Sequence, residues 1–172
     1  FGFDRESNVI FTPNVTFSLN YVIHGLLREG DGLVITSMEH NAVARPAESV
    51  RRKGVNLRIA QCDENGRLDL DHFEQQITAG TKAVVMLHGS NVCGSLMPIA
   101  EAGKICRERG VFFIVDAAQT AGVFPIHMKE MNINGLAFTG HKGLLGPQGI
   151  GGLLLDEQLA EAIRPIIDGG TG

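Results

Sequence analysis

One lysine and one aspartate have the surroundings that covalent chemistry on a carbonyl compound requires. Lys142 follows the apolar run 135–139 and lies between His141 and a glycine-rich stretch. An amine confined among polar groups can become partly neutral and attack a carbonyl carbon. Asp116 ends another apolar run, where its carboxylate can pair with a protonated ring nitrogen. Together the two residues predict a site for covalent catalysis by an amine.

Each of these residues also has an ordinary interpretation. A lysine in a loop is usually a surface residue, and an aspartate after a strand is more often a helix N-cap or a metal ligand. The segment from Gly135 to Lys142 has some likeness to a phosphate-binding loop, but His141 separates Gly140 from the lysine. Gly143 also stands where that loop needs Ser or Thr, which excludes an NTPase of this kind.

Short apolar runs rich in β-branched residues alternate along the chain with segments of helical period. The expected strands lie at 9–11, 33–35, 57–59, 83–87, 111–115, 135–139 and 149–155. The expected helices lie at 16–28, 42–53, 70–78, 99–109 and 157–163. Glycine C-caps are expected to end four of them, at Gly30, Gly54, Gly80 and Gly110.

Two features of the strands predict how the sheet is built. The runs 83–87 and 111–115 are apolar throughout, as strands covered by helices on both faces must be. The last two runs are separated by only nine residues, too few for a helical crossover, which predicts an antiparallel pair. The predicted fold class is therefore α/β, with a mostly parallel sheet and helices on both faces.

Ligands of such sheets bind beyond the carboxyl ends of the strands. The segments that follow the predicted strands contain Asp116 and Lys142, and they also contain His40, His88 and His141. We therefore expect the site at this edge of the sheet. No role is assigned to His88, and Cys93 is interpreted as a small packing residue.

Composition excludes several classes of partner. The 172 residues suit one domain, and the net charge of −4, with scattered basic residues, argues against nucleic-acid binding. No apolar run reaches the ~20 residues that a membrane span needs, and no secretory leader is recognisable. Three cysteines without a C-x-x-C pair indicate neither a disulfide framework nor a zinc site, which favours a reducing cytoplasm. Because the chain begins at Phe1 rather than at methionine, we expect a fragment.

The motifs around the two reactive residues match those of a known family. Val115-Asp116-Ala117-Ala118-Gln119 is followed, 26 positions after the aspartate, by Gly140-His141-Lys142. This arrangement resembles the core signature of the class V aminotransferase and cysteine desulfurase family, whose members are pyridoxal-phosphate (PLP) enzymes of fold type I. The segments 36–42, 90–94, 146–151 and 169–172 resemble further family motifs in the same order.

The resemblance implies a role for each of several residues. Lys142 would hold PLP as a Schiff base, Asp116 would pair with the pyridine nitrogen, and His40 would stack on the ring. Gln119 and Asn91 would donate to the phenolic oxygen of the cofactor.

The resemblance also implies how the phosphate of PLP is held. The phosphate ligands would be Thr139, His141 and the start of the first helix, at Asn14, Val15 and Thr16. Val15 departs from the family pattern, which has Thr there, so only its backbone N–H could serve. Thr171 would reach the phosphate in the partner subunit, which implies a homodimer with shared active sites.

The nearest likeness within the family is to the cysteine desulfurases, which take sulfur from cysteine, leave alanine and carry a persulfide to a sulfur-acceptor protein. A class V aminotransferase, a selenocysteine lyase-type β-elimination enzyme and a non-catalytic fragment remain alternatives. The chain 1–172 is expected to be the PLP-binding large domain of fold type I, without the N-terminal arm and the C-terminal small domain. The catalytic cysteine and the arginine that binds the substrate carboxylate are expected after Gly172.

Overall fold

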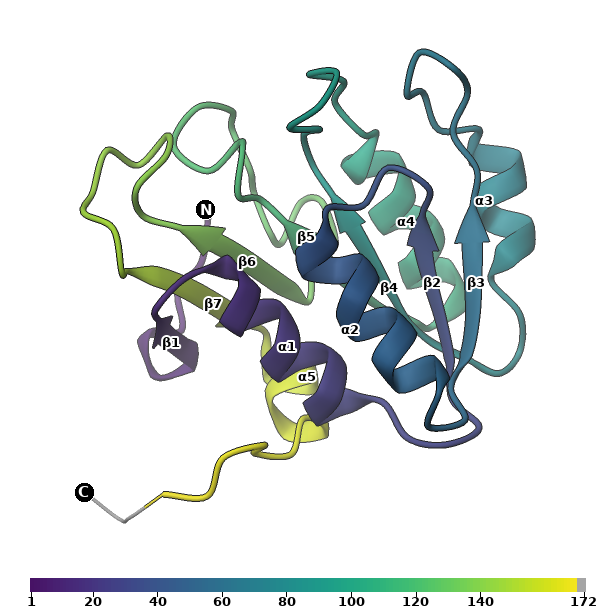
Figure 1. Cartoon of the computed structure of the whole chain (residues 1–172), viewed down its shortest axis with the longest axis horizontal. Helices are drawn as coiled ribbons and strands as arrows, with labels where there is room; N and C mark the ends of the chain where they lie inside the picture. Colours follow the sequence, from purple (N-terminus) through teal and green to yellow (C-terminus); the bar gives the residue numbers. More distant parts are fainter. Residues whose placement is uncertain (170–172) are drawn as a thin grey trace.

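A seven-stranded sheet forms the centre of the computed structural model, which describes residues 1–169 (Figure 1). The strands are β1 Val9–Thr12, β2 Gly32–Thr36, β3 Asn56–Ala60, β4 Thr81–Leu87, β5 Phe112–Asp116, β6 Gly135–Thr139 and β7 Gly151–Leu155. The helices are α1 Val15–Leu26, α2 Asn41–Arg51, α3 Leu70–Gln76, α4 Ile99–Arg109 and α5 Glu157–Ala162, with a short 3-10 turn η1 at Glu6–Asn8. Within the described residues, no helix is long and apolar enough to cross a membrane.

The strands lie in the order β1-β7-β6-β5-β4-β2-β3. The five consecutive strands β6, β5, β4, β2 and β3 run parallel to one another. β7 is antiparallel to β6, with Leu136 opposite Leu154, and is also antiparallel to β1. The antiparallel pair predicted from the short spacing is therefore confirmed, although its second strand begins at Gly151 rather than at residue 149.

Helices cover both faces of the sheet, as predicted (Figure 1). Successive side chains of a strand point to opposite faces, so each buried strand contributes to two cores. In β2, Leu33 and Ile35 pack in the core that contains residues of α1, α2 and α5. Val34 packs in the core that contains residues of α3 and α4. This double covering explains why the central strands are apolar throughout.

The glycine C-caps are confirmed only in part. Gly110 caps α4 in the left-handed conformation, with φ of 66°. Gly30 and Gly54 are also left-handed, but they lie a few residues beyond the ends of α1 and α2. The prediction for Gly80 is wrong, because α3 ends at Gln76 and the buried Ile77 continues the chain in an extended conformation.

Candidate functional site

The predicted site residues lie at the carboxyl edge of the parallel strands. Asp116 is the last residue of β5, and Thr139 is the last residue of β6. His40 precedes α2 in the turn after β2, and Lys142 lies in the loop after β6. Because neighbouring parallel strands end at the same edge, these loops gather there (Figure 1).

The carboxylate of Asp116 is buried, and only one of its two oxygens accepts a hydrogen bond within residues 1–169. Its side chain is only 4% exposed, and Oδ1 accepts a hydrogen bond from the Ala118 N–H at 2.9 Å. Within residues 1–169, Oδ2 accepts no hydrogen bond. The same part of the chain has no fully buried side-chain oxygen without a partner, so Oδ2 must retain contact with solvent. This oxygen can therefore accept a hydrogen bond from a ligand.

Two basic side chains act on the ionisation of Asp116. Burial raises the pKa of Asp116, and the Ala118 N–H and the charges of His40 and Lys142 oppose this rise. The charges of His40 and Lys142 thus favour the ionised form of Asp116, although neither side chain forms a hydrogen bond or ion pair with it within residues 1–169. A carboxylate held in this way is stabilised by a cation placed beside it, whether from the protein or from a ligand.

His40 begins α2 and has a defined ring orientation. Its Nδ1 accepts a hydrogen bond from the Ala42 N–H at 3.1 Å, so a neutral ring carries its proton on Nε2. His40 as a residue is exposed at the edge of the sheet. His40 thus caps α2 through Nδ1, and within residues 1–169 its Nε2 makes no hydrogen bond.

A candidate anion site lies where α1 begins beside the end of β6. Thr139 Oγ1 and His141 Nδ1 are 2.9 Å apart, and Asn14 Oδ1 caps α1 by accepting from the Phe17 N–H at 3.2 Å. Gly151 pairs with Thr139, and a Cβ on Gly151 would lie 2.8 Å from the Asn14 Cα.

These contacts place the start of α1 close to Thr139 and His141. Val15 is buried whereas Thr16 is exposed at this helix end. The free N–H groups and the dipole at the helix start favour an anion there.

Two further predicted residues lie on adjoining loops. Gln119 is half-buried after β5, and Asn91 is exposed in the loop after β4. A Cβ on Gly89, two residues before Asn91, would lie 3.6 Å from the Gln119 Cβ, so these loops are in contact. Thr171, the last of the predicted site residues, lies outside the described residues.

Three polar residues of this edge were missed or misread from the sequence. Glu39 reaches from the turn between β2 and α2 to the end of β4, where both carboxyl oxygens accept from the Leu87 N–H at 3.1 Å. His88 is buried, its Nδ1 lies 2.9 Å from Thr120 Oγ1, and burial lowers its pKa. The only available signal was that both residues follow strands.

The interpretation of Cys93 as a packing residue is wrong, because its side chain is exposed. Hydrogen bonds from Ser90 and Ser95 lower the pKa of its thiol to about 7. The serines on either side of Cys93 were the signal in the sequence for an accessible thiol.

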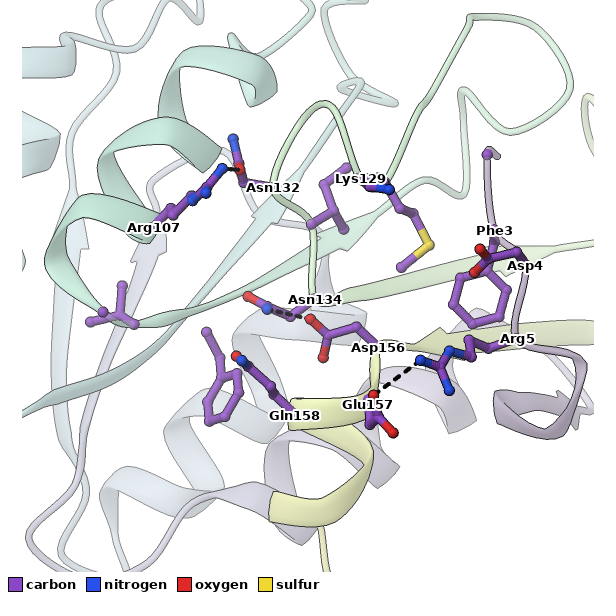
Figure 2. Close-up of a pocket in the computed structure, with 16 residues that line it drawn as sticks. Phe3, Asp4, Arg5, Arg107, Lys129, Asn132, Asn134, Asp156, Glu157 and Gln158 are labelled. Atoms are coloured by element: carbon purple, nitrogen blue, oxygen red, sulfur yellow. Dashed lines mark hydrogen bonds and ion pairs between the residues drawn. The ribbon is translucent and has the colours of Figure 1, made fainter.

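A large hollow lies at the opposite edge of the sheet and contains none of the predicted site residues (Figure 2). Its volume is about 610 Å³, and it opens where β5 and β6 begin. Several of its polar side chains are paired: Asn134 donates to Asp156 at 2.6 Å, and Arg5 contacts Glu157 at 3.1 Å.

Comparison with known proteins identifies the family of this chain. The family model for aminotransferase class-V matches residues 1–172. A probable cysteine desulfurase of Pyrococcus abyssi is 38% identical over 168 residues, which cover 95% of this chain and 42% of that protein. A probable cysteine desulfurase of Methanothermobacter thermautotrophicus is 33% identical, over 98% of this chain and 43% of the relative.

A solved structure shares the same fold. The apo structure of a cysteine desulfurase from Thermococcus onnurineus NA1 matches with a TM-score of 0.89 and 38% identity, over 95% of this chain and 42% of that one. The chain thus spans about two fifths of the length of the curated relatives it matches. Since a family model covers the whole sequence, the chain belongs to the aminotransferase class-V family.

Proposed function

We propose that residues 1–172 form the PLP-binding large domain of a cysteine desulfurase. The observation that carries this proposal is the buried carboxylate of Asp116, whose Oδ2 accepts no hydrogen bond within residues 1–169 and whose pKa the charges of His40 and Lys142 lower. The relatives named above support the choice of reaction, because proteins 33–38% identical to this chain are described as cysteine desulfurases.

The site residues fit the chemical groups of PLP. Lys142 would hold the aldehyde carbon as a Schiff base, and Asp116 Oδ2 would accept the N–H of the pyridine ring. His40 would lie against the ring face, and Gln119 and Asn91 would donate to the phenolic oxygen. When bound in this way, PLP supplies an electron sink that works while its ring nitrogen stays protonated.

The anion site at the start of α1 fits the phosphate group. Thr139 and His141 would contribute side-chain donors, while Asn14, Val15 and Thr16 would contribute the helix start with its free N–H groups. A valine at position 15 does not hinder this role, because the backbone N–H is independent of the side chain. Thr171 would complete the phosphate site of a partner subunit.

Lys142 has a second task in this proposal. With PLP and substrate bound, the amine of Lys142 would be the acid and base that moves protons at the substrate carbons. The burial of Asp116 supports its proposed pairing with the pyridine nitrogen of PLP. A carboxylate in a medium of low polarity would bind a protonated ring nitrogen strongly. His40 would shield the face of the PLP ring against which it lies.

We also propose a substrate, a protein partner, an oligomeric state and a cellular compartment for this enzyme. Cysteine is the substrate, a sulfur-acceptor protein takes the sulfur, and a homodimer shares its two sites. Exposed apolar side chains near the site, Leu145 at 92% and Val92 at 85%, support a subunit contact there. Three free cysteines, one of them a thiol with a lowered pKa, support a reducing, cytoplasmic compartment.

The test is to supply the full-length protein with PLP, cysteine and a thiol reductant, and to measure alanine and sulfide. We expect both products in equal amounts, and neither from the Lys142→Ala variant. A keto acid formed from an amino donor, without alanine, would instead show an aminotransferase. If the protein binds PLP but forms no product, the result would support the non-catalytic alternative.

A further inference from the structure

The carboxyl group of Glu39 joins two strand ends that the sheet itself leaves unconnected. The hydroxyl of Thr36, the last residue of β2, donates to Glu39 Oε1 at 2.7 Å. The backbone N–H of Leu87, the last residue of β4, donates to both carboxyl oxygens at 3.1 Å. This second contact spans 48 positions of sequence, so it is a tertiary link between strands rather than a local cap.

The Leu87 N–H requires this acceptor because the ladder between β2 and β4 stops short of it. The last pair in register joins Ile35 with Val85. After β2 the chain turns toward β3, where the Ser37 N–H donates to the Ala60 carbonyl at 2.9 Å. A buried backbone donor without a partner is unfavourable, and the carboxyl group of Glu39 supplies the missing acceptor.

The same link connects two residues of the proposed cofactor site. Leu87 stands in register with Asp116 on the neighbouring strand β5. Glu39 itself directly precedes His40, the N-cap of α2. The strand beside Asp116 and the turn that presents the imidazole are therefore tied together by one side chain.

We propose that Glu39 is a positioning residue of this site, which fixes the place of His40 relative to Asp116 without touching the cofactor. The inference rests on the proposed function, because it assigns Glu39 to the PLP site. Its action needs an acceptor for the Leu87 N–H but no negative charge. A neutral carboxyl group or an amide offers the same acceptor through its carbonyl oxygen.

The electrostatic surroundings agree with a neutral Glu39. Burial raises the pKa of Glu39 to about 8, the charge of Asp116 adds to the rise, and the hydrogen bonds from Thr36 and Leu87 oppose it. The other titratable groups that face it are Cys62 after β3 and the adjacent His40. The raised pKa favours a neutral carboxyl group at Glu39 next to the charge of Asp116.

The experiment compares Glu39→Ala and Glu39→Gln with the same changes at Glu130, which is exposed and makes no hydrogen bond within residues 1–169. The first measurement is the dissociation constant of PLP, from the absorbance of the bound cofactor at pH 7. The second is the ¹⁵N spectrum of the His40 ring in protein without PLP, assigned with a His40→Asn variant.

Glu39→Ala should weaken PLP binding by about tenfold or more and shift the His40 signals, because it removes a buried acceptor. Glu39→Gln should stay within about threefold of the wild type in affinity, with His40 signals unchanged, since the amide keeps that acceptor. Both Glu130 variants should match the wild type.

A folded Glu39→Ala protein with normal PLP affinity and normal His40 signals would overturn the proposal. So would a Glu39→Gln protein that binds as weakly as the alanine variant, because a charge would then be required. If Glu39→Ala does not fold, Glu39→Asp replaces it, since the shorter side chain cannot reach the Leu87 N–H. If the wild type does not bind PLP, the proposed function fails, and the His40 spectrum alone still decides the role of Glu39.

Discussion

Replacing Glu39 with Gln should remove a pH dependence from the stability of the protein. Burial raises the pKa of Glu39 to about 8, from an ordinary value of 4.5. The unfolded chain therefore releases this proton near pH 4.5, whereas the folded chain keeps it until about pH 8. Because the unfolded state binds fewer protons within this range, the free energy of unfolding falls as the pH rises.

The size of this effect follows from the width of the range. From pH 4.5 to about 8, at ~1.4 kcal/mol for each pH unit, the loss amounts to at most about 5 kcal/mol. The measured loss should be smaller than this limit, because the Glu39 residue is half-buried and water reaches part of it. The loss should be complete above about pH 8, where Glu39 is ionised in both states.

Urea unfolding between pH 5 and 9 measures this effect in the wild type, Glu39→Gln and the control Glu130→Gln. The difference between wild type and Glu39→Gln should fall steadily up to about pH 8 and then stay level. Taking the difference cancels other groups that titrate in this range, such as Cys93 with its pKa of about 7. A difference that stays constant within about 0.5 kcal/mol from pH 5 to 8 would refute the reasoning.

Two other predictions test the packing and the free thiols. Gly103→Ala should destabilise the protein by about 1–3 kcal/mol in urea unfolding, because the new Cβ would overlap the Met131 carbonyl oxygen. Gly80→Ala, which has open space, should have little effect, and equal losses would contradict this packing. Iodoacetamide should label Cys93 before Cys62, with a rate that rises around pH 7, because hydrogen bonds lower the pKa of Cys93 and burial raises that of Cys62. Ser95→Ala should slow this labelling at pH 7, whereas preferential labelling of Cys62 would disagree with the structure.

The features that the sequence predicted are those with a local cause. The strands that precede Asp116 and Lys142 are short apolar runs, and the carboxyl edge follows from their parallel arrangement. The antiparallel pair followed from the nine residues between two runs. In each case the controlling interaction lies within a few residues, so composition and spacing reveal it.

The features that were missed depend on contacts between distant segments. Glu39 binds a backbone N–H at Leu87, and a backbone donor has no signature in a sequence. The adjoining glycines of β7 looked like part of an apolar run, but at Gly152 the Phe138 ring occupies the space that a Cβ would need. Gly80 was expected to cap a helix, yet the buried Ile77 had already directed the chain out of α3. Such positions are decided by tertiary packing.

Lys142 has four competitors for the cofactor, and the structure gives each of them another setting. Lys82 contacts Asp31 at 3.5 Å near the amino end of β4, and Lys104 lies 4.0 Å from Glu108 on α4. Lys53 follows α2, and Lys129 borders the hollow at the opposite edge (Figure 2). Among the five lysines, Lys142 alone has a charge that acts on the pKa of Asp116.

The most direct measurement is borohydride reduction of the protein with PLP, followed by peptide mapping. A pyridoxyl group should be found on Lys142, and the Lys142→Ala variant should trap none although it keeps its fold. Lys104→Ala, an exposed lysine on α4, provides the control and should trap the cofactor normally. A pyridoxyl group on any other lysine of the wild type would contradict the assignment of Lys142.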